Sequence, residues 1–334
     1  MAEPLIAIAG ASSLLGREVA ERLEAGPFAL ARIRLLDAGD AVGVLTELRG
    51  EPVVTAPIER DSLEDADIVI LCGRPEEMAG LLDRPLKAGG LVLAIGDGDA
   101  PADVPVVNMD VNPQALGALP VRPGRIAAAG PSALFLTNVL HAIESAAPLC
   151  AVECMLFEPA SSFGREALDE LFQQAANLMS FGSVPVGVLG RQLAFNIIPL
   201  SLTATLGGQI RQDRIVREIR RVLGYEDGRL ALKGFVAPVF HGHSALVRVS
   251  PRKSVAREAL LAAFEGSDLF SVAPSGDAAG SEASPVEWAG QVPIRLGEIV
   301  PAGAGAWWIW ALADDLKGGA ARNVVRIAEA LSGR

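Results

Sequence analysis

Aromatic residues and cysteines are scarce in this chain of 334 residues. Phe, Trp and Tyr make up 5% of the chain, whereas hydrophobic residues of all kinds make up 50%. The core must therefore be built largely from Ala, Val, Leu and Ile, which suits helices packed on a buried parallel sheet. The chain has three cysteines, Cys72, Cys150 and Cys154. This number is small and odd, which argues against a disulfide framework, so we expect a reducing compartment. Cys150 and Cys154 flank the start of a predicted strand, and we expect both in the core as small apolar residues.

Positive charge and long apolar runs are also in short supply. The chain has 29 Lys and Arg against 40 Asp and Glu, a net charge of −11. Nucleic acids and anionic membranes are bound by basic surfaces, so this balance argues against both as partners. No apolar stretch reaches the roughly 18 residues of a membrane-spanning helix, and no charged-then-apolar leader opens the chain. We therefore expect a soluble, cytoplasmic protein of one large or two medium-sized domains.

The first third of the chain alternates short apolar segments with helical patterns. Strands are predicted at residues 5–9, 32–36, 67–72 and 91–95, and an amphipathic helix at residues 17–24. Strands separated by helices in this way indicate βαβ units and a parallel sheet. The sequence predicts an α/β protein whose first domain, residues 1–130, is of the Rossmann type.

The pattern changes from about residue 147. Strand-like segments at residues 151–157, 235–240 and 245–249 now accompany two strong helices at residues 165–179 and 212–223. This order predicts an α+β domain over residues 131–313, with an exposed loop at residues 271–285. Residues 314–334 are predicted to form a C-terminal helix that packs back on the first domain. Trp307, Trp308 and Trp310 could form a stacking platform, but packing beneath this last helix is the favoured interpretation.

A glycine turn joins the first predicted strand to the first helix. Its residues suit a phosphate-binding turn, in which backbone N–H groups and the helix N-terminus hold a pyrophosphate. The candidate cofactor-binding residues are Gly10, Ser12, Ser13, Leu14, Leu15 and Gly16. Ser13 stands where a glycine would let the phosphate approach closely, so an inherited but unused turn is the alternative.

Two acidic residues follow the second predicted strand. Asp37 ends that strand, where a carboxylate can accept a hydrogen bond from a ribose 2′-OH and repel a 2′-phosphate. Asp40 adds a second negative charge nearby. If the turn binds a dinucleotide, either NAD or NADP is possible and NAD is favoured.

Several segments, in chain order, resemble motifs of the aspartate-semialdehyde dehydrogenase family. They are residues 10–16 for its GATGxVG turn, 104–112 for VPLVVPEVN, 162–166 near its SGAGxxG segment, 192–199 for QIAFNVIP, 238–244 for PVxxGHS and 314–323 for DNLRKGAAxN. The resemblance runs nearly end to end. It implies the Rossmann-type fold, a catalytic and dimerisation domain, and a homodimer.

The resemblance also implies a reaction, and this chain departs from it. Family enzymes reductively dephosphorylate an aspartyl phosphate: a cysteine takes the acyl group, a histidine handles the proton and NADPH delivers hydride. In this chain His243 matches the histidine, but Ser132 stands at the position of the cysteine. At the position of the family arginine that binds the substrate carboxylate, this chain has Val236. The chain is similar to the divergent Usg-like branch, which lacks the catalytic cysteine.

The substrate-binding residues implied by the resemblance are only partly present. Glu218 matches the glutamate for the substrate amino group, and Arg221 stands for the phosphate-contacting lysine. The phosphate-binding arginine expected before the VPLVVPEVN motif is missing from residues 94–103, and Asp40 stands at the position of the NADP-recognising arginine. Loss of a covalent nucleophile can cost about 10⁶-fold in rate. The favoured prediction is a catalytically reduced homodimeric homologue that binds a nucleotide or a small amino-acid-like ligand.

Other interpretations of these residues remain open. Ser132 could be a hydroxyl nucleophile activated by His243, although no acid that would orient the histidine is identifiable, or a helix-start serine that satisfies backbone donors. His241 and His243 should share a face of a strand, but a third metal ligand is lacking, so no metal is predicted. Glu218 and Arg221 could form a solvated ion pair on a helix.

Two other functions are therefore kept beside the favoured one. The first is an active oxidoreductase or hydrolase that acts on an acyl or aldehyde substrate through Ser132 and His243. The second is a non-catalytic interaction protein without a ligand.

Overall fold

The structure, a computed structural model, describes residues 3–59, 61–73, 78–81, 89–96, 98–118, 124–272 and 284–333. The chain forms two compact units, one made of residues 1–130 with 319–334, the other of residues 131–318. Most of the loop predicted at residues 271–285 lies outside the described residues. In the described ranges no helix is long and apolar enough to cross a membrane.

The first unit is built on a seven-stranded sheet in the order β5-β2-β1-β6-β7-β9-β8. All of its strand pairs are parallel. Every residue of β1, β6 and β7 is buried, as expected for parallel strands that are covered on both faces. The strands are β1 (Leu5–Ala9), β2 (Arg32–Asp37), β5 (Ala56–Pro57), β6 (Ile68–Leu71), β7 (Leu91–Ile95), β8 (Val106–Val107) and β9 (Gly124–Ala128). The predicted Rossmann-type sheet is confirmed.

Two helices cover part of this sheet. Helix α1 (Leu14–Ala25) follows β1, and helix α8 (Ala320–Ser332), from the C-terminus, packs in the same apolar core. Asn323 ties α8 to the sheet: its amide nitrogen donates to the carbonyl of Val107 and its amide oxygen accepts from the N–H of Met109, both at 2.9 Å. A small antiparallel hairpin, β3 (Leu45–Leu48) and β4 (Glu51–Val54), follows β2. Short 3-10 helices are η1 (Gly39–Ala41), η2 (Ala79–Leu81) and η3 (Pro113–Ala118).

The second unit contains a mixed seven-stranded sheet in the order β11-β12-β10-β13-β16-β15-β14. Among the described strands, β10 pairs with β12 and β14 with β15 in parallel, and the other pairs are antiparallel. The strands are β10 (Leu149–Glu158), β11 (Ile198–Pro199), β12 (Leu230–Val236), β13 (His243–Pro251), β14 (Phe270–Val272), β15 (Ile294–Gly303) and β16 (Ala306–Ala313). This mixed sheet agrees with the predicted α+β character of the second domain. The unit extends to residue 318, beyond the boundary predicted at residue 313.

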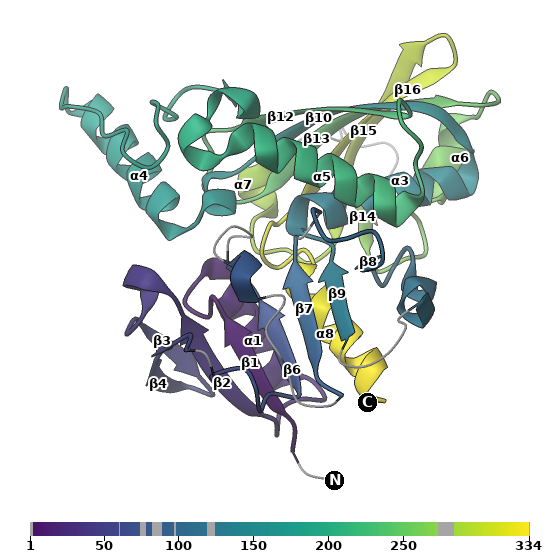
Figure 1. Ribbon diagram of the computed structural model, residues 1–334. Coiled ribbons are helices and arrows are strands. Elements are labelled where there is room, and N and C mark those ends of the chain that lie inside the picture. The colour runs from purple at the N-terminus through teal and green to yellow at the C-terminus, as the bar shows by residue number, and fades with distance from the viewer. Residues whose placement is uncertain are drawn as a thin grey trace. The chain divides into compact units, whose positions relative to one another are not determined.

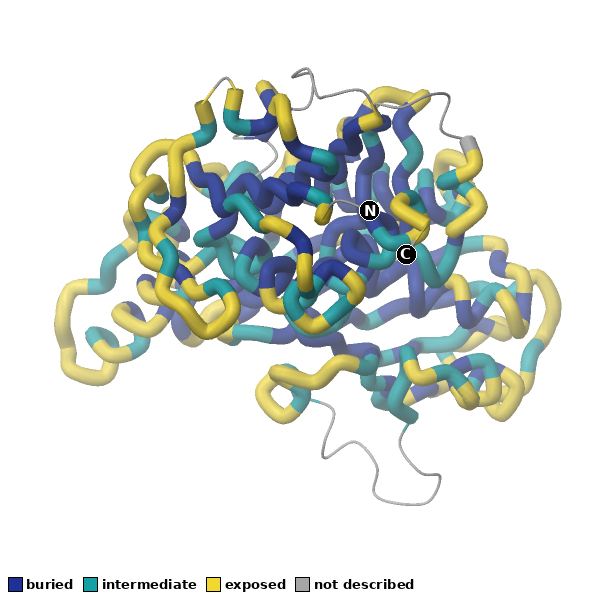
Figure 2. Tube along the Cα trace, turned by 90° about the horizontal axis from the view of Figure 1, so that it is seen from below, coloured by how far each residue is buried: buried dark blue, intermediate teal, exposed yellow. Residues whose placement is uncertain are grey.

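Helices α3 and α5 lie side by side along one face of this sheet (Figure 1). Their apolar residues meet the inward-facing residues of the central strands in one core, for example Leu136 and Ile219 with Leu156. The helices of the unit are α3 (Pro131–Ala146), α4 (Arg165–Met179), α5 (Gly208–Leu223), α6 (Arg257–Ala262) and α7 (Pro285–Trp288), with short 3-10 helices η4 (Ala160–Phe163), η5 (Leu200–Leu202) and η6 (Ala204–Leu206). Exposed residues gather in the loops and outer turns, and buried ones in the strands (Figure 2).

The cysteine prediction is half right. Cys154 is buried, but Cys150 is exposed. The pairing of β10 with β13 shifts register between Leu149 and Ala151, so a bulge interrupts the alternation that would have turned Cys150 inward.

The three tryptophans lie on one strand of the second unit. Helix α8 belongs to the first unit, whereas all three tryptophans lie on β16 of the second. Trp307 packs against the core under α3 and α5, and the Trp310 ring lies 6.3 Å from the Phe157 ring. Because successive side chains of a strand alternate between its faces, β16 could not direct all three rings to one helix.

Candidate functional site

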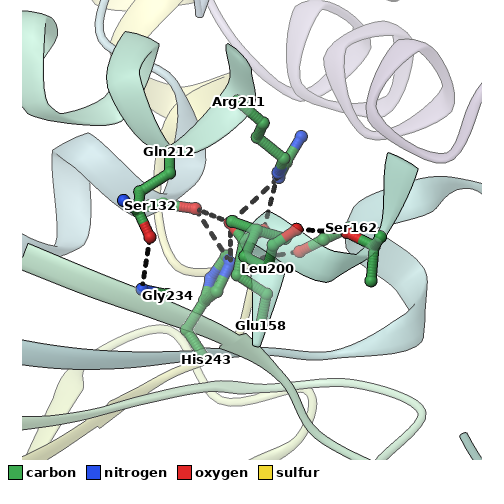
Figure 3. A network of polar contacts seen from close by, with 9 residues as sticks. Ser132, Glu158, Ser162, Leu200, Arg211, Gln212, Gly234 and His243 are labelled. Carbon is green, nitrogen blue, oxygen red and sulfur yellow. Dashed lines mark hydrogen bonds and ion pairs between the residues drawn. The ribbon is translucent and has the colours of Figure 1, made fainter. Parts of the chain in front are cut away.

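The hydroxyl of Ser132 is engaged by side chains. Ser132 is the second residue of α3, directly after Pro131, whose fixed φ suits the first position of a helix. Its side chain is 2% exposed, and its Oγ donates to Oε1 of Glu158 at 2.6 Å. The hydroxyl therefore enters a polar network, shown in Figure 3, whose members come from segments far apart in the sequence.

Glu158 is the centre of this network. It ends strand β10, is 0% exposed, and is held in a fork by Arg211 from the first turn of α5. Nε of Arg211 lies 2.6 Å from Oε2 of Glu158, and Nη2 lies 3.0 Å from Oε1. The guanidinium also lies over the ring of Phe163, 5.0 Å from its centre. Such a bidentate pair fixes both the position and the charge of a carboxylate.

His243, at the start of β13, is 1% exposed and faces two serine hydroxyls. Its Nε2 lies 3.2 Å from Oγ of Ser132 and 3.1 Å from Oγ of Ser162. Because the one proton of the Ser132 hydroxyl is directed to Glu158, the bond between Ser132 and His243 requires a proton on Nε2. Nδ1 is buried without a hydrogen-bond partner among the described residues, and the ring stacks on Phe135 at 6.3 Å.

The protonation states follow from burial and from the two charges. Burial lowers the pKa of His243, and the charge of Arg211 adds to this, outweighing the carboxylates of Asp315 and Glu158. For Glu158, burial would raise the pKa, but the charge and hydrogen bonds of Arg211 prevail and lower it. At neutral pH we therefore expect a neutral imidazole beside a carboxylate that Arg211 neutralises. Both groups that could take a proton from Ser132 are thus weaker bases than in water.

His241 does not share a strand face with His243, contrary to the prediction. It precedes the strand, and between the two lies Gly242, whose φ of 93° breaks the extended backbone. Nδ1 of His241 lies 3.7 Å from Oδ1 of Asp315, and the interaction with that carboxylate raises the pKa of His241 against the effect of burial. Within the described ranges, no cluster of three His, Cys, Asp or Glu side chains could hold a metal ion.

Glu218 and Arg221 lie farther along α5. Glu218 is buried, so the alternative of a solvated ion pair is wrong for this residue, while Arg221 is half-buried. Glu218 follows Arg211 by seven residues and so shares its helix face, about 10 Å further along the axis. The structure thus places Glu218 on the face of α5 that carries Arg211.

The glycine turn of the first unit requires its glycines for packing. Gly10 has a φ of 81°, and a Cβ there would lie 2.5 Å from the nitrogen of Gly73. A Cβ on Gly16 would lie 2.2 Å from the carbonyl oxygen of Gly10. Ser13 closes the turn, because its Oγ donates to Gly10 at 2.7 Å and accepts from the N–H of Gly16 at 2.9 Å.

The same turn leaves donors for an anion. The first four N–H groups of a helix have no partner within it. Here the N–H of Gly16 and that of Arg17 both bond to Ser13, whereas those of Leu14 and Leu15 have no partner among the described residues. These two adjacent N–H groups fit a phosphate at the start of α1.

Asp37 is buried and already holds the turn. Its Oδ2 accepts from the N–H of Ser12 at 3.0 Å. Burial raises its pKa above the ordinary value despite that bond. The Asp37 carboxylate therefore helps to hold the backbone of the glycine turn in place. Asp40, three residues later, is exposed.

Three residues of the network escaped the sequence prediction: Glu158, Ser162 and Arg211. Glu158 is an acid at the end of a largely apolar strand and directly before a proline, a pattern that indicates a buried carboxylate at a strand end. Arg211 immediately precedes the predicted helix at residues 212–223. Glu158 supplies the acid that the sequence prediction lacked, although it bonds to the serine.

Known proteins resemble this chain over nearly its whole length. The family model for the semialdehyde dehydrogenase dimerisation domain matches residues 140–314. The USG-1 protein homologue of Azotobacter vinelandii is 25% identical over 334 residues, which cover 98% of this chain and 97% of that protein. The aspartate-semialdehyde dehydrogenase of Synechocystis sp. is 24% identical over 337 residues, which cover 98% and 96%.

Solved structures share the fold. The structure of a probable aspartate-semialdehyde dehydrogenase from Pseudomonas aeruginosa superposes with a TM-score of 0.87 at 22% identity, covering 99% of both chains. That of aspartate semialdehyde dehydrogenase II from Vibrio cholerae, complexed with ASA, superposes with a TM-score of 0.83 at 22% identity, covering 100% of this chain and 99% of the other.

Proposed function

This chain belongs to the semialdehyde dehydrogenase family, and we propose that it is a homodimeric member that no longer carries out acyl-phosphate reduction. It keeps a nucleotide-binding turn and a buried polar centre, through which it binds a nucleotide or a small amino-acid-like ligand. The proposal separates the fold, which the chain shares with its relatives, from the chemistry, which depends on a few side chains.

The state of Ser132 carries this proposal. A hydroxyl needs a strong base to act as a nucleophile, because it is far less acidic than a thiol. The Ser132 proton is directed to Glu158, 2.6 Å away, and the basicity of that carboxylate is reduced by Arg211. The pKa of His243 is lowered as well. No group in this network is suited to generate an alkoxide at Ser132.

A nucleotide is supported by the geometry of the glycine turn. The N–H groups of Leu14 and Leu15 would hold the pyrophosphate, and Gly10 and Gly16 give the turn its shape. When bound, NAD or NADP would supply hydride transfer. NAD remains favoured because Asp37 and Asp40 put negative charge at and just after the end of β2, which would repel the 2′-phosphate of NADP.

A homodimer is supported by the matched family model, which describes a dimerisation domain. Large apolar side chains of α4 and the segment after it are exposed, among them Phe172, Met179, Phe181, Phe195 and Ile197. Exposed apolar side chains in such number are typical of a surface that a partner covers.

The decisive assay uses aspartate semialdehyde with phosphate and either NAD or NADP. We expect the wild-type protein to show no turnover above that of Ser132→Ala. Wild-type turnover that Ser132→Ala abolishes would contradict the proposal. Calorimetric titration with NAD and with NADP tests the ligand, and binding of neither would favour a pure interaction protein.

The distance of 3.2 Å between Oγ of Ser132 and Nε2 of His243 favours one second candidate, a serine-dependent acyl hydrolase. Such an enzyme would be labelled at Ser132 by a fluorophosphonate probe, detected by mass spectrometry of the peptide. We expect no labelling, because the side chain is buried and its proton is held by Glu158.

A further inference from the structure

The atom at the acylation position touches a buried carboxylate. Oγ of Ser132 lies 2.6 Å from Oε1 of Glu158, and the two side chains are 2% and 0% exposed. Charges interact more strongly in such a water-poor environment than at the surface. A neutral hydroxyl is stabilised there because it donates a hydrogen bond, whereas a negative charge on the same atom would be opposed.

Glu158 is held in its ionised form. Arg211 binds it through two nitrogens, at 2.6 and 3.0 Å, and is itself only 29% exposed. Of the two members of this pair, the negative one is in contact with position 132.

The influence of Glu158 on His243 is weaker than its influence on Ser132. Its Oε1 lies 3.8 Å from Nε2 of His243, compared with 2.6 Å from Oγ of Ser132. Its charge would favour a proton on the imidazole, but it would disfavour negative charge on residue 132 more strongly, because that atom is closer. The charge of Glu158 would therefore destabilise a thiolate at position 132 more than it would stabilise an imidazolium at His243.

We propose that Glu158 is a positioning residue that keeps the side chain at position 132 protonated. This deepens the proposed function and rests on its premise that reduction through a thioester has been lost. It follows that a cysteine at position 132 is not sufficient for a reactive thiolate. Removing the charge of Glu158 as well should produce one, because the anion in contact with the sulfur is then gone while the positive charge of Arg211 remains in the network.

The test compares Ser132→Cys with the double variant Ser132→Cys/Glu158→Gln. Both are made with Cys150→Ser, since Cys150 is exposed and would react. Cys72 and Cys154 are buried, and burial raises the pKa of Cys154 to about 12 and that of Cys72 further still, so they stay silent. The matched control is Ser132→Cys/Glu170→Gln, because Glu170 is a buried glutamate of the same unit that bonds instead to the N–H groups of Val188 and Leu189.

The thiol pKa is measured from the pH dependence of alkylation by iodoacetamide and from the ultraviolet absorbance of the thiolate, which does not depend on reagent access. At pH 7 we expect at least about tenfold less thiolate in Ser132→Cys than in the Glu158→Gln double variant. The Glu170→Gln control should match Ser132→Cys. Equal thiol pKa values in the two test proteins would overturn the inference.

If the Glu158→Gln double variant does not fold, Ser132→Cys/Glu158→Asp takes its place, because the shorter side chain withdraws the carboxylate from the sulfur while burial of the thiol stays the same. A thiol pKa lower than that of Ser132→Cys supports the inference, and an equal thiol pKa refutes it. The two proposals fail separately. Turnover by the wild-type protein would refute the proposed function, whereas a thiol that does not respond to Glu158, in a protein whose wild type is inactive, refutes only the role of Glu158.

Discussion

At the scale of single residues, Arg211 is the counter-charge of a fully buried carboxylate, that of Glu158. Removing Arg211 would leave a fully buried carboxylate without a counter-charge, which typically costs about 3–5 kcal/mol. We expect Arg211→Met to lower the free energy of unfolding in urea by about that amount. The matched control is Arg248→Met, whose partner Glu153 is 55% exposed, and it should change stability by less than about 1 kcal/mol. A similar loss in both variants would show that burial of the pair has no special effect.

The two histidines give the stability opposite pH dependences. The unfolded side chain titrates near about pH 6.5. Because burial lowers the folded pKa of His243, the unfolded chain binds more protons in the window just below that pH, and stability falls as the pH drops through it. The pKa of His241 is raised by Asp315, so its contribution is present below that pH and is lost as the pH rises through the folded value.

These windows can be separated by unfolding in urea from about pH 5 to about pH 8. We expect His243→Gln to flatten the acid side of the profile and His241→Gln to flatten the alkaline side. If either substitution removed the slope on the opposite side, the assigned direction of that pKa shift would be wrong.

At the scale of elements, the turn between β1 and α1 is tightly packed, and in the proposed function it also holds the nucleotide. Gly16→Ala would place a methyl group 2.2 Å from the carbonyl oxygen of Gly10. Because that contact is with backbone, the turn must open, and we expect a loss of about 1–3 kcal/mol in stability together with loss of NAD binding by calorimetry. Gly39→Ala is the control: its φ of 58° is also unfavourable, but a Cβ there meets nothing within 4 Å. If Gly16→Ala bound NAD as tightly as the control, the turn would not be the nucleotide site.

At the scale of the whole molecule, we expect two copies per particle by sedimentation velocity. Met179→Glu/Phe181→Glu places two charges in the exposed apolar surface at the end of α4 and just after it, and should weaken association by about tenfold or more if this surface lies at the interface. Leu30→Glu is the matched control, because Leu30 is a similarly exposed apolar residue of the first unit. A monomeric wild-type protein would contradict the proposed homodimer.

Much of the fold followed from local pattern. The strands of the first unit are buried on both faces and therefore stand out as continuous apolar runs, such as residues 5–9 and 91–95. The glycine turn was recognisable because its spacing and its place between strand and helix are local. Errors arose where regular alternation was assumed, as at the bulge beside Cys150 and the left-handed Gly242 between the two histidines.

What the sequence by itself determined was the class of fold, the family and the absence of a thiol at position 132. These depend on hydrophobic period and on ordered motifs, which are properties of neighbouring residues. Only the tertiary structure decided what that serine touches. Ser132, Glu158, Arg211 and His243 come from the start of α3, the end of β10, the first turn of α5 and the start of β13. Their meeting depends on how a mixed sheet brings distant segments together, and no local pattern specifies that a carboxylate will reach the hydroxyl and that an arginine will keep it charged.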